Sequence, residues 1–217
     1  MNQQAALQKA IAREATRTEL FSNSPMWWMT NHNPSGASDG SENIQSWNLE
    51  DHATCLATVA KRFKNKLGLE FETVDAFNEP NANWWKADGT QEGCHINVAI
   101  QATIVGHLQT HLASCGLKTE ISASDDSYYD QAVTTLKTIG RSALGKISRI
   151  QVHGYQKGSG GRAGVRKLAI QAEKSLCNSE YGDGVASGAD MARYLLQDLR
   201  TMKPTTWECW QLLDQGG

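Results

Sequence analysis

Two short runs decide the fold: Ala76-Phe77-Asn78-Glu79-Pro80 and Asn178-Ser179-Glu180-Tyr181-Gly182-Asp183-Gly184. Each places a glutamate directly after an apolar stretch that has the character of a β-strand. In a parallel α/β barrel, the catalytic residues stand at the C-terminal ends of the strands. The two runs therefore predict a parallel barrel that carries two carboxylates at one mouth.

Outward from these runs, strand-like and helix-like segments alternate along the whole chain. Such alternation implies parallel strands joined by right-handed crossovers. A complete (β/α)8 TIM-type barrel needs about 250 residues, so 217 residues predict an incomplete one. We expect one partial barrel domain over 1–217, with about six strand–helix units. The expected strands are 20–24, 73–77, 119–123, 147–153, 175–179 and 206–210, and the expected helices are 1–13, 51–66, 95–114, 127–141, 164–173 and 188–201.

Charge and composition argue against several classes of partner. The chain has 21 Lys and Arg against 23 Asp and Glu, a net charge of −2. This gives no basic footprint for nucleic acid and no polybasic patch for a membrane. No apolar run approaches the roughly 20 residues of a membrane span, and 1–13 has the pattern of a polar helix and not that of a signal peptide. We expect neither nucleic acid nor a membrane as partner.

Three motifs could suggest other chemistry. His107, His111 and Cys115 share a helix face, but the first and last are about 12 Å apart along the axis, too far for one tetrahedral zinc. The run Gly158-Ser159-Gly160-Gly161-Arg162 lacks the Gly-Lys-Ser/Thr of a phosphate loop. Asp125-Asp126 is interpreted as the start of a helix, with a catalytic role as the alternative. We predict no metal and no cofactor.

The two glutamates supply the minimal equipment for breaking a glycosidic bond. Pro80 disfavours helical backbone at the residue before it, so we expect Glu79 on a stiff, extended segment. Asn78 offers an amide suited to a sugar hydroxyl. Glu180 ends a strand and opens into a glycine-rich loop, as an unobstructed nucleophile requires. Asp183 is the alternative for that role.

Other strand ends carry side chains that suit a sugar site. His153 and Tyr155 lie two residues apart and so share one face of their strand. A tyrosine hydroxyl there could hold a carboxylate nucleophile, whereas a single histidine on a strand is more often structural. The chain has seven tryptophans, of which we assign about half to the core. Trp210, at the end of the last strand, is expected to form the floor of a sugar-binding site.

Together these residues resemble the fungal and bacterial endo-β-1,6-galactanases of glycoside hydrolase family 30. The similar segments are collinear and cover nearly the whole chain. They are Phe21-Ser22-Asn23-Ser24-Pro25-Met26-Trp27-Trp28-Met29, Phe77-Asn78-Glu79-Pro80, Trp84-Trp85-Lys86-Ala87-Asp88-Gly89-Thr90-Gln91-Glu92-Gly93-Cys94, Val152-His153-Gly154-Tyr155-Gln156, Ser179-Glu180-Tyr181-Gly182-Asp183-Gly184 and Trp210-Gln211-Leu212-Leu213-Asp214.

The resemblance implies a (β/α)8 barrel with a β-rich side domain and a retaining mechanism. It implies Glu79 as acid/base, Glu180 as nucleophile and a polysaccharide or oligosaccharide as substrate. The family is mostly secreted, although this chain shows no signal peptide. The first two strand–helix units and the side domain of the family are not in this sequence. The residues implied to bind substrate are Asn23, Trp28, Asn78, Trp85, His153, Tyr155 and Trp210.

Two departures from the family keep other functions open. An arginine that the family carries on its second strand has no counterpart here, and Cys177 stands where an aromatic residue is expected. The glutamates are shared by relatives that cleave glucosylceramide, β-1,6-glucan or xylan, so they do not choose the sugar. A carbohydrate-binding relic without catalysis is a third hypothesis.

Overall fold

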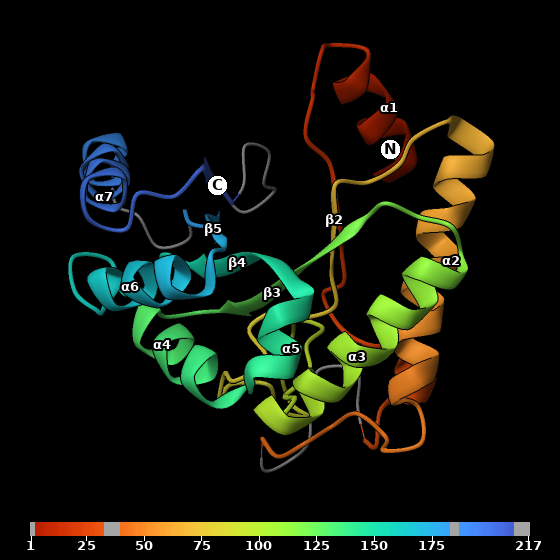
Figure 1. Cartoon of the computed structure of the whole chain (residues 1–217). Helices are drawn as coiled ribbons and strands as arrows, with labels where there is room; N and C mark the ends of the chain where they lie inside the picture. Colours follow the sequence, from red (N-terminus) through yellow and green to blue (C-terminus); the bar gives the residue numbers. More distant parts are fainter. Residues whose placement is uncertain (1–2, 33–39, 183–186, 211–217) are drawn as a thin grey trace.

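The computed structural model describes residues 3–32, 40–182 and 187–210, in which helices and short strands alternate (Figure 1). The strands are β1 Glu19–Phe21, β2 Thr73–Asp75, β3 Glu120–Asp126, β4 Ile147–His153, β5 Ser175–Glu180 and β6 Thr206–Trp207. The helices are α1 Gln3–Ile11, α2 Leu49–Leu67, α3 Val98–Ser114, α4 Tyr129–Thr138, α5 Arg141–Lys146, α6 Arg162–Ala172 and α7 Gly188–Thr201, with a 3₁₀ turn η1 at Trp27–Met29.

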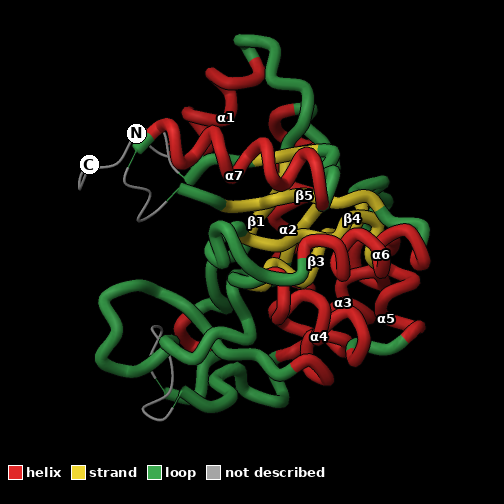
Figure 2. Tube along the Cα trace, turned by 90° about the vertical axis from the view of Figure 1, so that its left-hand side faces the viewer, coloured by secondary structure: helices red, strands yellow, loops and turns green. Residues whose placement is uncertain are grey.

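The six strands run parallel in the order β1-β2-β3-β4-β5-β6, so each pairs with the next along the chain. Helices α3, α4, α5 and α6 pack against this sheet, and α2 packs against α3 (Figure 1). Long loops gather at one side of the molecule, away from the helices (Figure 2). The prediction of an incomplete α/β barrel is confirmed, because the strands form a half-barrel.

The outer face of the sheet is apolar because alternate strand residues point toward the helices. Val74 and Ile121 join the side chains of α2 and α3 in one buried cluster. Val152 and Leu176 join those of α4 and α6 in a second. Burial of about 25 cal/mol per Å² of apolar surface drives this packing.

The inner face is polar, which composition did not predict. One Glu19 carboxylate accepts hydrogen bonds from Thr73 Oγ1 at 2.5 Å, Ser122 Oγ at 2.6 Å, Arg149 Nη2 at 2.6 Å and Gln151 Nε2 at 3.0 Å. These four donors lie on β2, β3 and β4. A single side chain of β1 thus ties three other strands together across the concave side.

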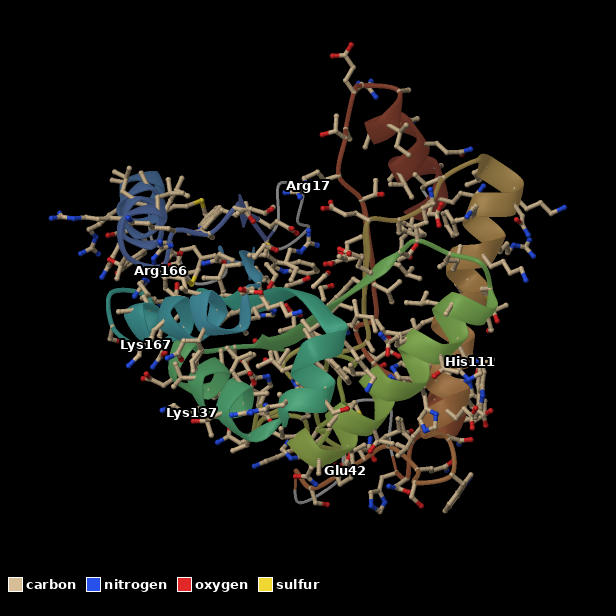
Figure 3. The ribbon with its side chains drawn as sticks, viewed as in Figure 1. Arg17, Glu42, His111, Lys137, Arg166 and Lys167 are labelled. Carbon is tan, nitrogen blue, oxygen red and sulfur yellow. The ribbon has the colours of Figure 1, made fainter. Side chains whose placement is uncertain are left out.

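Arg17 links the two edges of the half-barrel. Its guanidinium donates to both carboxylate oxygens of Glu72, at 3.0 and 2.6 Å, and to Thr206 Oγ1 of β6 at 3.1 Å. Figure 3 shows Arg17 between the chain that leads into β1 and the C-terminal segment. The first and last strands are therefore held near each other at this end of the sheet.

A buried polar cluster joins α7 to the rest of the fold. Asp198 is 1% exposed and accepts hydrogen bonds from Arg162 Nε at 2.6 Å, Tyr129 Oη at 2.9 Å, Asn178 Nδ2 at 2.6 Å and Trp207 Nε1 at 3.0 Å. The glycine-rich segment before Arg162 therefore leads into a structural anchor, as expected of a loop that is not a phosphate site.

Two sequence-based boundaries are wrong for identifiable reasons. The helix expected over 127–141 is two helices, α4 and α5, because Gly140 adopts a φ of +86° between them. The strand expected to end at 123 runs to Asp126, and α4 begins only at Tyr129. Asp125 and Asp126 are therefore buried strand residues and do not start the helix.

Of the three residues His107, His111 and Cys115, which share a helix face, His111 contacts the neighbouring helix α2. His111 of α3 faces α2 (Figure 3), with its Nε2 3.0 Å from Glu50 Oε1 and 3.2 Å from Thr54 Oγ1. All five cysteines are free thiols. In the described segments of the chain, no helix has both the length and the hydropathy to cross a membrane.

Candidate active site

The C-terminal ends of the strands bring four of the predicted site residues to one cavity of about 240 Å³. These are Glu79 after β2, Tyr155 after β4, Glu180 at the end of β5 and Trp210 after β6. A second cavity of about 430 Å³ on the inner face shares Glu180 and Trp210 with it. The complete lining of the first is Glu79, Trp84, Gln91, Tyr128, Tyr155, Glu180 and Trp210.

Glu79 is held by its backbone in an unusual conformation. Its φ is +46°, so the extended segment expected before Pro80 is not formed. The Glu79 amide donates to the Asp125 carbonyl at 3.0 Å, and the Glu79 carbonyl accepts from Ala82 N and Trp85 Nε1, both at 2.9 Å. A tight turn thus overrides the preference of the residue before a proline and aims the carboxylate.

Glu180 is held by a direct hydrogen bond. The Tyr155 hydroxyl donates to Glu180 Oε1 at 2.8 Å, which is the contact expected of a tyrosine beside a nucleophile. Burial raises the pKa of Glu180, while the charge of His153 and the Tyr155 hydrogen bond oppose that rise. Both partners therefore favour the ionised carboxylate that a nucleophile needs.

His153 lies between the two glutamates. Its Nδ1 is 3.3 Å from Glu79 Oε1 and 3.7 Å from Glu180 Oε1, and its Nε2 is 3.1 Å from Asp125 Oδ2. These are ion-pair contacts, since neither ring nitrogen makes a well-aligned hydrogen bond to a described residue. Burial would lower the pKa of His153, but the charges of Asp125 and Glu180 and the contacts of the ring with Asp125 and Glu79 hold it well above the usual value.

His153 is one of the predicted substrate-binding residues, and that role stays a prediction. Its exposed fraction is 1%, so a sugar in the cavity meets the glutamates and Tyr155 first. The side chains at the strand ends cover His153, which points inward from β4.

Trp85, also predicted to bind substrate, is buried as well. It is 2% exposed, and its ring packs so closely on Gly93 that a Cβ there would lie 2.1 Å from the ring. Its indole nitrogen instead supports the Glu79 turn. The neighbouring Trp84 is 39% exposed and lines the cavity. Trp84, which was not among the predicted site residues, therefore lines the cavity, while a role of Trp85 in substrate binding stays a prediction.

Trp210 is placed beside Glu180 by a close backbone contact. Its amide donates to the Tyr181 carbonyl at 2.9 Å. A Cβ on Gly182 would come within 2.0 Å of the Trp210 carbonyl oxygen, so only glycine fits there. Asp183 and the residues after Trp210 lie outside the described part of the chain.

Besides His153 and Trp85, three further predicted residues line neither cavity. Asn23 donates to the Glu92 carbonyl at 2.7 Å, and Trp28 is 53% exposed and packs edge-on against Trp27. Asn78 is 5% exposed, and its Oδ1 has no hydrogen-bond partner among the described residues. A role of these residues in substrate binding stays a prediction.

Sequence reasoning set aside one residue that belongs to this site. Asp125 is 1% exposed and contacts both His153 and Glu79. The signal was a pair of carboxylates directly after a strand, which we interpreted as a helix start. Tyr128, which packs edge-on against Trp84 in the cavity wall, gave no signal.

The inner-face cavity explains the place of Cys177. This thiol is buried and donates to Glu208 Oε1 at 3.6 Å. Burial raises the pKa of Glu208 to about 7, and the charge of Glu19 adds to that rise.

Solved structures share this fold. A conserved exported protein from Bacteroides fragilis superposes with a TM-score of 0.78 at 17% identity, over 95% of this chain and 50% of that one. The catalytic domain of GH30 xylanase C from Talaromyces cellulolyticus gives 0.72 at 19% identity, over 94% and 49%. At such identity, the likeness establishes the fold alone.

The sequence comparisons go further. Residues 1–147 match the model of O-Glycosyl hydrolase family 30. An endo-beta-1,6-galactanase from Hypocrea rufa is 50% identical over 217 residues, which are 100% of this chain and 45% of that protein. The chain thus spans about half the length of the curated relative that it matches. On the family match, this identity and the half-barrel, the chain belongs to O-glycosyl hydrolase family 30.

Proposed function

We propose that this chain carries the catalytic centre of a retaining glycoside hydrolase, with Glu79 as acid/base and Glu180 as nucleophile. The supporting observation is that one atom, His153 Nδ1, lies 3.3 Å from Glu79 Oε1 and 3.7 Å from Glu180 Oε1. The two Oε1 atoms can therefore be no farther apart than the sum of these distances, a bound that includes the separation of about 5–5.5 Å between the carboxyl groups of retaining enzymes.

The residues of the cavity divide the reaction between them. Glu180 attacks the anomeric carbon while Glu79 protonates the leaving oxygen, and a covalent glycosyl-enzyme forms. Glu79, now ionised, then takes a proton from the water that releases the sugar. Tyr155 and His153 stabilise the ionised Glu180, and Trp84, Tyr128 and Trp210 offer aromatic surface for the sugar rings.

We propose β-1,6-galactan, as in arabinogalactan side chains, as the substrate. The support is the 50% identity to an endo-beta-1,6-galactanase. A solved structure of the same fold is named a xylanase and another an endo-beta1,6-glucanase, so the fold alone does not determine the sugar. Binding without turnover is the competing proposal, since the inner-face cavity leaves Glu180 and Trp210 open on a second side.

The test is hydrolysis by the 217-residue chain of β-1,6-galactan, β-1,6-glucan and xylan, followed by product chromatography. We expect galacto-oligosaccharides and little product from the other two polymers. Release of products only from glucan or xylan would change the substrate. Retention of galacto-oligosaccharides without hydrolysis, measured by calorimetry, would favour the non-catalytic function.

The Tyr155–Glu180 hydrogen bond predicts a shift in the pH profile. In Tyr155→Phe, Glu180 loses a donor that favours its ionised form, so its pKa rises further. Because the nucleophile must be ionised, the acidic limb of kcat/KM moves to higher pH, and activity falls most at low pH. Tyr194→Phe, whose hydroxyl bonds Arg193 on the exposed side of α7, is the control. An unchanged acidic limb in Tyr155→Phe would contradict the assignment.

A further inference from the structure

Asp125 contacts three segments of the proposed site. Its Oδ2 is 3.1 Å from His153 Nε2, and its Oδ1 accepts from Ser179 Oγ at 2.5 Å, next to Glu180. Its backbone carbonyl accepts from the Glu79 amide at 3.0 Å. One residue on β3 therefore joins the segment of the acid, the ring between the glutamates and the segment of the nucleophile.

The backbone at this junction is unusual on both sides. Asp125 has a φ of +60° and Glu79 a φ of +46°. Residues with a side chain seldom occupy this region, and they do so where the surroundings hold them. Here the two residues hold each other through the amide-to-carbonyl hydrogen bond. The arrangement aims the Asp125 carboxylate at His153 and the Glu79 carboxylate at the opposite ring nitrogen.

During the proposed reaction the charges of Glu79 and Glu180 change, whereas that of Asp125 does not. Glu79 and Asp75 face it from the β2 side, Asp125 from β3 and Glu180 from β5, while Tyr155 of its own segment packs edge-on against the ring. Burial and the charge of Asp125 hold the pKa of Asp75 well above its usual range. Glu79 begins protonated and Glu180 ionised. In the glycosyl-enzyme, Glu180 is esterified and Glu79 carries the charge.

We propose that Asp125 is a positioning residue that keeps His153 cationic throughout the cycle, so that Nδ1 stabilises the negative charge first on Glu180 and then on Glu79. This inference rests on the proposed function. Asp125 itself exchanges no proton and touches no substrate. The negative charge passes from Glu180 to Glu79 during the reaction. Because His153 Nδ1 lies 3.3 Å from Glu79 Oε1 and 3.7 Å from Glu180 Oε1, a cationic His153 stabilises that charge in both steps without moving.

The test compares Asp125→Asn with Asp126→Asn. Asp126 is an equally buried carboxylate on the same strand, and its oxygens bond Ser124 at 2.7 Å and Asn81 at 2.6 Å. The protonation of His153 is followed by NMR of its ring nitrogens from pH 5 to 8, roughly the range in which an ordinary histidine titrates. We expect a cation at every pH in the wild type and in Asp126→Asn, and a titrating or neutral ring in Asp125→Asn.

Kinetics on the galactan give the second readout. In Asp125→Asn, kcat should fall at least about tenfold, up to the roughly 10²–10⁴-fold that a positioned proton donor contributes, while KM stays nearly unchanged. Asp125→Glu, which keeps the charge, should restore the cationic ring even where its kcat stays low.

A neutral His153 in the wild type, or a cationic one in Asp125→Asn, would overturn the proposal. So would a loss of kcat no larger in Asp125→Asn than in Asp126→Asn. The wild-type NMR titration needs neither a variant nor turnover. It tests the charge of His153, and the same titration of Asp125→Asn and Asp126→Asn tests the role of Asp125, even if the chain hydrolyses none of the polymers, which would contradict the proposed function alone.

Discussion

Glu180→Ala should lower hydrolysis of β-1,6-galactan by several orders of magnitude, with the fold intact. The variant removes the carboxylate that we propose as the nucleophile, and leaves Glu79 and His153 in the site. The measurement is kcat on an aryl galactoside and on the polymer. Unchanged hydrolysis would rule out Glu180 as nucleophile.

An added small anion makes this result specific. In Glu180→Ala, azide can enter the space of the lost carboxylate and bond to the anomeric carbon, while the leaving oxygen departs from an activated aryl galactoside. The product is then a glycosyl azide of inverted configuration. Glu208→Ala, which removes a carboxylate of the adjoining cavity, is the matched control and should show no azide rescue. Rescue in the control, or none in Glu180→Ala, would argue against the assignment.

Asp198→Asn should destabilise the fold by about 3–5 kcal/mol, the usual cost of leaving one partner of a buried ion pair uncompensated. Arg162 is 3% exposed at its side chain, and its Nε lies 2.6 Å from Asp198 Oδ1. The variant leaves the guanidinium charge buried and disturbs three further hydrogen bonds to the same carboxylate. Chemical denaturation of both proteins measures the difference.

The matched control lies on the same helix. Asp190 pairs with Arg193 at 2.8 Å, but the two side chains are 39% and 64% exposed. Asp190→Asn should therefore cost at most about 1 kcal/mol. Equal losses in the two variants would show that the buried cluster around Asp198 does not anchor α7.

Strands and helices were predictable where apolar residues recur with the period of that element. Helix α7 falls on the expected residues 188–201, and β4 on 147–153. The same pattern placed Glu79, Tyr155, Glu180 and Trp210 at one edge of the sheet, where they share a cavity. Strand ends in a parallel sheet meet at one edge, so this much follows from order along the chain.

What the sequence could not predict depends on contacts between distant residues. The φ of Glu79 depends on a hydrogen bond to Asp125, which lies 46 residues later in the sequence (125 − 79). Which of Trp84 and Trp85 faces the cavity depends on the space that Gly93 leaves. The polar inner face arises because one Glu19 side chain reaches three other strands. Local patterns carry none of these three facts.

The most direct test of the central claim, that Glu180 and Glu79 work as a retaining pair, is trapping of the glycosyl-enzyme. A 2-deoxy-2-fluorogalactoside with an activated leaving group should bond covalently to the chain, and peptide mass spectrometry should place the fluorosugar on Glu180. In Glu79→Gln the label should still form with this leaving group but should be released more slowly, since no base activates water. A label on another residue, or inverted product without any label, would contradict the account.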